Sequence, residues 1–291
     1  MRIVISMTTI PARIDRIEPT IESLSCQTRT PDCIYLAVPK KPAREDQKDL
    51  VYNIPPFLSK YDVKIVHLKK DHGPICKLLG GIQSENDPDT CIVTVDDDIV
   101  YPPCFLEEIE QHSRNYPNEA VGFGGWNFYC RPPFVRMMDS IHDRSNLPAF
   151  AVMKNGEPAE GLCGFAGALY KRRFFPHPET MISWIKENRM LFRTDDVVIS
   201  AYLGYQNIPR RVFKLSTPFG DTVFAMKSTG LSSNDMRAFY HWFAARDYLN
   251  QKYKTFGGGS VTLFSAFVLW TVLIVCIVIL IGIGFYKLLF L

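Results

Sequence analysis

The sequence lacks the features that mark several common classes of protein. Its eight cysteines include no Cys-x-x-Cys pair and no Cys/His spacing of the kind that binds zinc. It has no Asn-x-Ser/Thr sequon, and residues 1–7 hold too few apolar side chains for the core of a signal peptide. These absences argue against a secreted domain stapled by disulfides. They favour reduced, mostly buried thiols in a domain that faces the cytosol.

The sequence also lacks a large excess of charge of one sign. The 33 basic and 30 acidic residues give a net charge of +3 and are well mixed along the chain, so no basic face for nucleic acid is expected. No internal repeat or low-complexity tract is present. With 291 residues, 47% of them hydrophobic, the chain can form one large catalytic domain, which we place at residues 1–255.

Charged residues are absent between Lys254 and Lys287, and residues 261–286 are almost wholly apolar. This run exceeds the ~20 residues that a helix needs to cross a bilayer, so it predicts a transmembrane helix rather than a buried core helix. The Gly-rich residues 256–260 form a linker before it, and residues 287–291 form a short tail. Because basic residues are more frequent before the span than after it, we expect a single-pass, tail-anchored protein whose domain faces the cytoplasm.

Short apolar segments alternate with helical patterns along the first hundred residues. Strands are expected at residues 3–7, 34–38, 63–68 and 91–95, and a helix at residues 14–24. Such alternation is typical of βαβ units, so the sequence predicts an α/β fold with a mostly parallel sheet flanked by helices.

Three carboxylates, Asp96, Asp97 and Asp98, follow the apolar strand at 91–95. In an open α/β sheet, ligands bind beyond the carboxyl ends of the strands, so this is where a site is expected. Adjacent carboxylates repel one another, and a hard divalent cation that also bridges phosphate oxygens would relieve the repulsion. The alternative is a solvated acidic turn.

These residues resemble the DXD segment of inverting GT-A glycosyltransferases of the large family-2 type. Further segments occur in the order of that family and together cover roughly residues 1 to 215: residues 8–13, residues 21–24 with Gln27, Gly73-Pro74 with Lys77, residues 161–170, and residues 194–197. The resemblance implies a GT-A, Rossmann-like fold and transfer of a sugar from a nucleotide-sugar donor.

The resemblance also implies roles for single residues on the donor side. Asp96 would contact the nucleoside, Asp98 would hold Mn²⁺ or Mg²⁺ on the diphosphate, and Asp97 would be the less defined member of the motif. Thr8, Thr9 and Arg13 would border the nucleotide, although their loop also suits an ordinary Pro-containing turn. Lys77 would reach a phosphate or the base of the donor, or else be a solvated helix lysine.

An inverting transfer also needs a carboxylate that takes the proton of the acceptor hydroxyl. The acidic pair Asp195 and Asp196 opens a helix-like stretch and is the candidate; the family's base maps to Asp196, with Asp195 as the substitute. The alternative is that the pair only caps the helix. His241 is a candidate additional metal ligand, or a histidine packed among aromatic side chains.

Two further features have competing interpretations. The glycines at 161, 164 and 167 match no phosphate-binding loop and either lie beneath donor and acceptor or allow close packing. Trp126 either presents an aromatic platform to a sugar or is buried.

Taken together, the sequence predicts a metal-dependent glycosyltransferase at a membrane surface, acting on a glycan, a lipid-linked or a protein acceptor. A haloacid-dehalogenase-type phosphatase and a non-catalytic, membrane-anchored carbohydrate-binding protein are the alternatives. The phosphatase requires its nucleophile on the first strand of the domain, and a later acidic pair that follows a strand.

Overall fold

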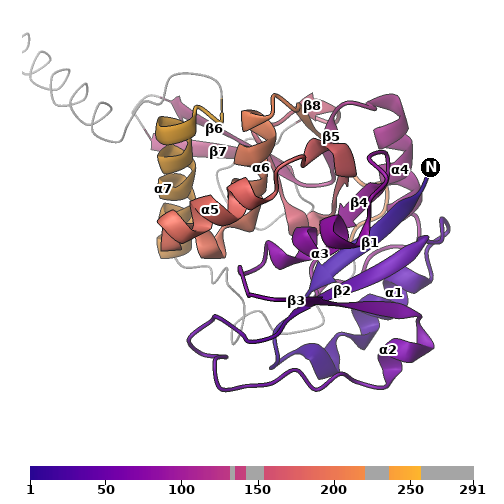
Figure 1. The fold of residues 1–291 in the computed structure, drawn as a ribbon. Helices are drawn as coiled ribbons and strands as arrows, with labels where there is room; N and C mark the ends of the chain where they lie inside the picture. The colour runs from indigo at the N-terminus through magenta and orange to yellow at the C-terminus, as the bar shows by residue number, and fades with distance from the viewer. Residues whose placement is uncertain (132–134, 142–153, 220–235, 257–291) are drawn as a thin grey trace, which may run out of the picture.

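A mixed sheet of eight strands forms the centre of the structure, a computed structural model that describes residues 1–131, 135–141, 154–219 and 236–256 (Figure 1). In spatial order its strands are β3 (Val63–Leu68), β2 (Cys33–Pro39), β1 (Ile3–Thr8), β4 (Cys91–Thr94), β10 (Ala168–Lys171), β5 (Ala120–Gly122), β11 (Arg210–Val212) and β8 (Glu157–Pro158). The first four strands run parallel, β10 runs antiparallel to both of its neighbours, and β11 is again parallel to β5.

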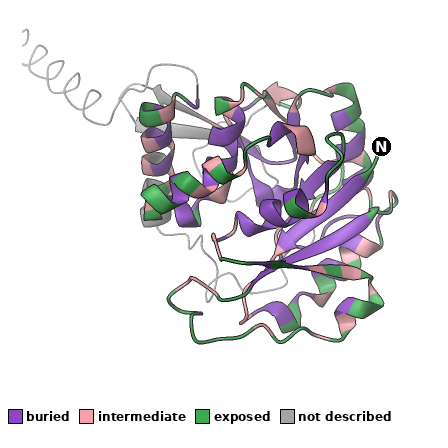
Figure 2. Ribbon diagram, in the orientation of Figure 1, coloured by how far each residue is buried: buried purple, intermediate pink, exposed green. Residues whose placement is uncertain are grey.

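The central strands are buried on both faces. Every residue of β2 and β4 is buried, which explains why the sequence shows continuous apolar runs there and not alternation. Figure 2 shows the central strands β1, β2 and β4 mostly in the colour of buried residues, whereas the edge strand β3 also carries intermediate and exposed residues. The fold class predicted from the sequence, an α/β fold with a mostly parallel sheet and flanking helices, is confirmed for the described residues.

A second sheet of three strands lies beside the first. It consists of β7 (Val135–Ile141), β6 (Gly125–Arg131) and β9 (Gly161–Leu162), all antiparallel. Gly161 lies against the ring of Trp126, because a Cβ at this position would come within 2.0 Å of that ring. The glycine is therefore needed for close packing, and Trp126 is fully buried.

Helices cover the main sheet and extend beyond it. They are α1 (Glu18–Ser25), α2 (Phe57–Lys60), α3 (Cys76–Ser84), α4 (Phe105–Asn115), α5 (Glu179–Glu187), α6 (Asp195–Tyr205) and α7 (Met236–Tyr253), with 3-10 turns η1 (Ile14–Arg16), η2 (Gly164–Ala166), η3 (Arg172–Phe174) and η4 (Arg189–Arg193). Helices α5, α6 and α7 gather at one side of the sheet, and α6 packs against both of the others (Figure 1).

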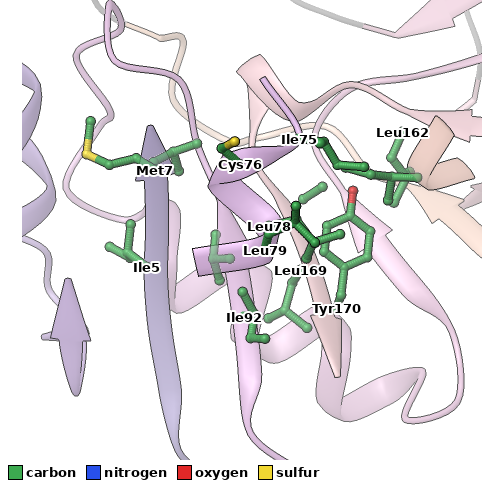
Figure 3. Packing of buried hydrophobic residues seen from close by; sticks show 14 of the residues in the cluster. Ile5, Met7, Ile75, Cys76, Leu78, Leu79, Ile92, Leu162, Leu169 and Tyr170 are labelled. Carbon is green, nitrogen blue, oxygen red and sulfur yellow. The ribbon is translucent and has the colours of Figure 1, made fainter. Parts of the chain in front are cut away.

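Helix α3 lies unusually close to the sheet. A Cβ on Gly80 would come within 2.7 Å of Ala37, and one on Gly81 would come within 2.7 Å of Ile92. The two glycines therefore allow the helix backbone to approach β2 and β4 directly. Figure 3 shows Cys76, Leu78 and Leu79 of this helix within the same apolar cluster as Ile92 of β4.

The first helix differs from the prediction. Residues 14–24 were expected to form one helix, whereas a 3-10 turn over Ile14–Arg16 is followed by α1 from Glu18. Pro19 is the physical reason, because proline lacks the amide hydrogen that a helix interior requires and fits only in a first turn. The helix must therefore start anew immediately before it.

The membrane prediction concerns residues that the structure does not describe. Within the described ranges no helix combines the length and apolar character needed to span a bilayer. The predicted span at 261–286, the tail at 287–291 and most of the linker at 256–260 lie outside those ranges. Six of the eight cysteines are described, all as free thiols, and four of them are buried, as expected.

Candidate functional site

The predicted site residues meet at one edge of the main sheet. Strands β1 and β4 run parallel and both end there, and β10, which is antiparallel to β4, starts there with Ala168 opposite Thr94. The segments that leave or enter this edge are residues 9–13, 95–98 and 164–167. The acidic motif therefore lies beyond the carboxyl end of a central strand, where ligands of open α/β sheets bind.

The middle aspartate of the motif joins two loops of the protein. Asp97 is buried; one of its carboxylate oxygens accepts a 2.5 Å hydrogen bond from the Thr9 hydroxyl, and the other lies 3.0 Å from an Arg13 guanidinium nitrogen. The backbone carbonyl of Asp97 accepts a hydrogen bond from Thr20. Asp97 therefore fastens the loop after β1 and the start of α1 to the loop after β4.

Asp96 and Asp98 flank this anchor and are more accessible. The side chain of Asp96 is 34% exposed and that of Asp98 is 18% exposed. Arg13 lies 3.7 Å from an oxygen of Asp98, which is too long for a hydrogen bond. The backbone amide of Asp96 donates to the Tyr101 hydroxyl, which in turn donates to the carbonyl of Phe165. Tyr101 thereby joins the acidic motif to the glycine-rich segment.

Lys77 is the cation at the centre of the site. Its side chain is only 4% exposed, and its ammonium nitrogen lies 2.6 Å from Asp96 and 2.9 Å from Asp195. Lys77 is therefore a buried, ion-paired lysine and not a solvated helix lysine. The contact with Asp195 is an ion pair, since its geometry does not meet that of a hydrogen bond.

The acidic pair opens α6, as the sequence predicts, but it does not cap the helix. The residue before the helix, Thr194, makes no side-chain capping bond. Asp196 accepts a 2.8 Å hydrogen bond from the amide of Gly164, which belongs to the segment before β10. Capping alone therefore does not account for the pair, because its carboxylates point to groups outside their own helix.

Burial and mutual repulsion change the acidity of these carboxyl groups. Burial, followed by the charges of Asp96 and Asp97, raises the pKa of Asp98 to about 6. Burial and the charge of Asp195 raise the pKa of Asp196 well above its usual range, although Lys77 opposes this. Burial also raises the pKa of Asp97, against the effect of Arg13.

Burial and neighbouring charge have opposing effects on the pKa of Lys77. Burial by itself would lower the pKa of Lys77, but the carboxylates of Asp195, Asp96 and Asp196 raise it well above its usual value. Lys77 is therefore charged at all physiological pH values, and it compensates part of the negative charge around it.

Two further predicted residues, Thr8 and His241, lie on β1 and α7. Thr8, the last residue of β1, donates its hydroxyl hydrogen bond to the carbonyl of Ala37 on the neighbouring strand. His241 is exposed on α7. In the described ranges, no three His, Cys, Asp or Glu side chains are placed to hold a metal ion together.

The structure also decides between the interpretations of Trp126 and of the glycines. Trp126 is buried, so it presents no platform to a sugar. Gly167 has a φ of +84° and a Cβ there would overlap Phe105, so it serves backbone geometry and packing. Gly164 is different, because a Cβ there would lie 2.7 Å from the Lys77 ammonium and 2.9 Å from Asp196.

Tyr101 was assigned no role from the sequence, and Gly73 was named only as part of the resembling segment before Lys77. Tyr101 lies within residues 95–102, the stretch around the acidic motif that carries the family resemblance, so its position there was a usable signal. Gly73 has a φ of +82°, and a Cβ there would lie 2.2 Å from the carbonyl oxygen of Phe192 in η4. That contact joins distant parts of the chain, and no local pattern in the sequence announces it.

Similarity between this chain and known proteins is found among solved structures. No protein-family model matches the chain, and no curated protein matches it. Among solved structures, it is similar to S. aureus TarS residues 1–349, with 10% identity, 75% of this chain and 59% of that chain covered, and a TM-score of 0.44. The same region of TarS in complex with UDP-GlcNAc gives 10% identity, 86% and 66% coverage, and a TM-score of 0.47.

A longer TarS structure gives 11% identity, 85% and 39% coverage, and a TM-score of 0.46. In each case the chain covers less than two thirds of the length of the TarS chain. At this distance the likeness assigns no role to any residue of this chain.

Proposed function

We propose that the chain is a glycosyltransferase that moves a sugar from a nucleotide-sugar donor to an acceptor hydroxyl. One observation carries the proposal: the acidic motif after β4 and the acidic pair at the start of α6 share a single buried cation, Lys77. A transferase needs one acidic group at the donor diphosphate and another at the acceptor hydroxyl, side by side. The two groups come from distant parts of the chain and meet at the edge of the sheet where ligands bind.

The metal belongs to the donor side. Asp98 is partly exposed, lies 3.7 Å from Arg13, and has a pKa raised to about 6 by burial and by neighbouring negative charge, which outweigh the opposing effect of Arg13 and Lys77. A site short of positive charge with a carboxylate oxygen to offer fits Mn²⁺ or Mg²⁺. When bound there, the ion supplies positive charge that offsets the charge developing on the diphosphate leaving group. His241 stays a predicted additional ligand.

The proposed chemistry is an inverting displacement. The acceptor oxygen forms a bond to the anomeric carbon while the bond from that carbon to the diphosphate oxygen breaks with its electron pair. The hydroxyl proton passes to the carboxylate of Asp196, which the amide of Gly164 holds by a hydrogen bond. Thr9 and Arg13 act indirectly in this scheme, because both fasten Asp97 and so hold the loop that carries Asp96 and Asp98.

Two structural features favour a transferase over the phosphatase. The acidic motif follows the fourth strand along the chain, whereas the phosphatase nucleophile belongs to the first. The later acidic pair opens a helix, whereas the phosphatase requires it after a strand. A non-catalytic carbohydrate-binding protein has no need of an acidic pair that faces a second acidic motif across a shared lysine.

The test is nucleotide diphosphate release by the 291-residue chain from a panel of nucleotide sugars, with Mn²⁺ or with chelator. UDP-GlcNAc, the ligand of one TarS structure, is the first donor to try. We expect metal-dependent release from one donor. Release of phosphate from a generic phosphomonoester, lost in Asp96→Asn, would support the phosphatase instead, and silence in both assays would support the binding protein.

We also propose that residues 261–286 anchor the domain in a membrane, with the domain in the cytoplasm and a glycan, lipid-linked or protein acceptor at the membrane surface. Protease added to intact vesicles should then digest the domain. Protection of the domain would reverse the proposed orientation.

A further inference from the structure

Lys77 occupies a position that its own helix would otherwise give to an apolar side chain. Its neighbours Cys76, Leu78 and Leu79 are all buried in the core (Figure 3). A lysine among them is costly unless its charge is compensated, because burial disfavours an ammonium group. The compensation comes from three carboxylates in two other segments, Asp96, Asp195 and Asp196.

The backbone on both sides of the Lys77 ion pairs is held in place. The carbonyl of Lys77 accepts a hydrogen bond from the Ser6 hydroxyl on β1, which fixes the first turn of α3 to the sheet. Gly73 packs against the carbonyl of Phe192, so the turn before α3 touches the segment before α6. The starts of α3 and α6 are therefore held against each other, and Lys77 and Asp195 face one another across that contact.

The two members of the acidic pair are consequently not equivalent. Asp195 is ion-paired with Lys77 at 2.9 Å, whereas Asp196 accepts a hydrogen bond from the amide of Gly164. An adjacent carboxylate repels a second negative charge, unless a cation compensates the first. Lys77 supplies that compensation while also contacting Asp96 on the donor side.

On this basis, and resting on the function proposed above, we propose that Lys77 is a positioning residue that acts through the acidic pair. It neutralises and holds Asp195, so that Asp196 is left as the carboxylate that takes the acceptor proton, and it ties this pair to Asp96. Lys77 is not itself a ligand of the donor phosphates in this arrangement, because its ammonium group is buried and already occupied.

The first test separates kcat from donor KM in Lys77→Met. Because a positioned general base contributes roughly 10² to 10⁴-fold to rate, we expect kcat to fall by about 10²-fold while donor KM changes by less than about threefold. Lys77→Arg, which keeps the charge, should restore a large part of kcat. A rise in donor KM with kcat unchanged would overturn the proposal and make Lys77 a donor-binding residue.

Lys171→Met is the matched control. Lys171 is also a buried lysine, but it lies on β10 opposite Cys91, at the far end of the strand pair from the site. We expect this variant to lower stability without the selective loss of kcat. An equal loss of kcat in both variants would mean that Lys77 acts only through stability.

The second test needs no activity. The titration of Asp196 is followed by ¹³C NMR of aspartate carboxyls, with Asp196→Asn to assign the signal. The ionisable groups that face Asp196 come from four segments: Asp195, Lys77, Asp96, Cys163 and Tyr170. Since Lys77 is the cation among them, Lys77→Met should shift the titration of Asp196 to higher pH, and Lys77→Arg should shift it less.

The two tests keep this inference distinct from the function on which it rests. A titration that does not move in Lys77→Met refutes the role of Lys77, whatever activity is found. A shifted titration in a chain that transfers no sugar from any donor would leave the coupling of Lys77 to the pair intact and refute the transferase.

Discussion

Two cations lie at the carboxyl edge of the sheet, and they hold their carboxylates in different ways. Arg13 and Thr9 occupy both oxygens of Asp97, whose side chain is 9% exposed. Lys77 contacts Asp96 and Asp195, whose side chains stay 34% and 12% exposed. The first group is closed to a ligand, because both carboxylate oxygens of Asp97 already accept hydrogen bonds from the protein. The second group leaves carboxylate oxygens available to a ligand.

The difference shows that some charged residues of a site stabilise the fold, whereas others are available to bind a ligand. A buried carboxylate whose acceptors are all occupied fixes a loop and has little left to offer a substrate. A carboxylate that is repelled by its neighbours and only partly compensated is ready to bind a cation or a proton. We therefore expect the Arg13 group to determine stability and the Lys77 group to determine activity.

The substitution Asp196→Asn should have the largest effect, and it acts on the Lys77 group. Losing the proton acceptor should lower the rate of sugar transfer by roughly 10² to 10⁴-fold, with donor binding unchanged. Transfer kinetics and donor calorimetry on the same preparation measure both quantities. Asp15→Asn, at a side chain that is 74% exposed, is the control and should transfer like the unaltered chain. Full activity of Asp196→Asn would remove the proposed base.

The substitution Arg13→Met removes the ion pair of the Arg13 group. Removing one partner of a buried ion pair leaves Asp97 uncompensated, so the free energy of unfolding should fall by about 3–5 kcal/mol in urea titrations. Arg16→Met, three residues away at a side chain that is 57% exposed, should change it by less than about 0.5 kcal/mol. Similar losses in the two variants would contradict the closed character of the Arg13 group.

The stability of Asp98→Asn as a function of pH tests whether Asp98 is only partly compensated. The pKa of Asp98 is about 6 in the folded chain, above the roughly 3.9 of an unfolded aspartate, so ionised Asp98 destabilises the fold. With chelator present, the substitution should raise the free energy of unfolding by about 3 kcal/mol above pH 6. That gain should disappear as the pH falls from about 6 to about 4. A gain that does not vary with pH would mean that Asp98 titrates normally.

The smallest expected effect is that of Gly164→Ala. The added Cβ would meet the far ends of the Lys77 and Asp196 side chains, which can move by a few tenths of an ångström. Stability should therefore change little, whereas transfer should slow by about tenfold because the base is displaced. Thermal unfolding and transfer kinetics compare the two. A stability loss without a change in rate would place Gly164 in the fold and not in the site.

Much of this arrangement follows from local patterns. The strands at 33–39 and 91–94 were predictable because parallel strands buried on both faces leave continuous apolar runs. The acidic motif after β4 and the helix starting at Asp195 were predictable from the residues next to them. The break at Glu18 was also encoded locally, in Pro19, but the helical spacing of the isoleucines concealed it.

The contacts within the site were not predictable in the same way. That Lys77 is buried and shared between two acidic groups depends on how closely α3 approaches the sheet and on where α6 begins. Likewise, Thr9 and Arg13 were expected at the nucleotide, and the structure shows them on Asp97. Such pairings arise between segments far apart in sequence, and the local patterns of a single sequence do not show which of these segments come into contact.

The most direct test of the central claim is the anomeric configuration of the product. If Asp196 takes the acceptor proton while the acceptor oxygen attacks from the face opposite the leaving diphosphate, the product sugar has the configuration opposite to that in the donor. NMR of the anomeric proton in the purified product measures it. The account predicts inversion, and retention of the donor configuration would contradict it.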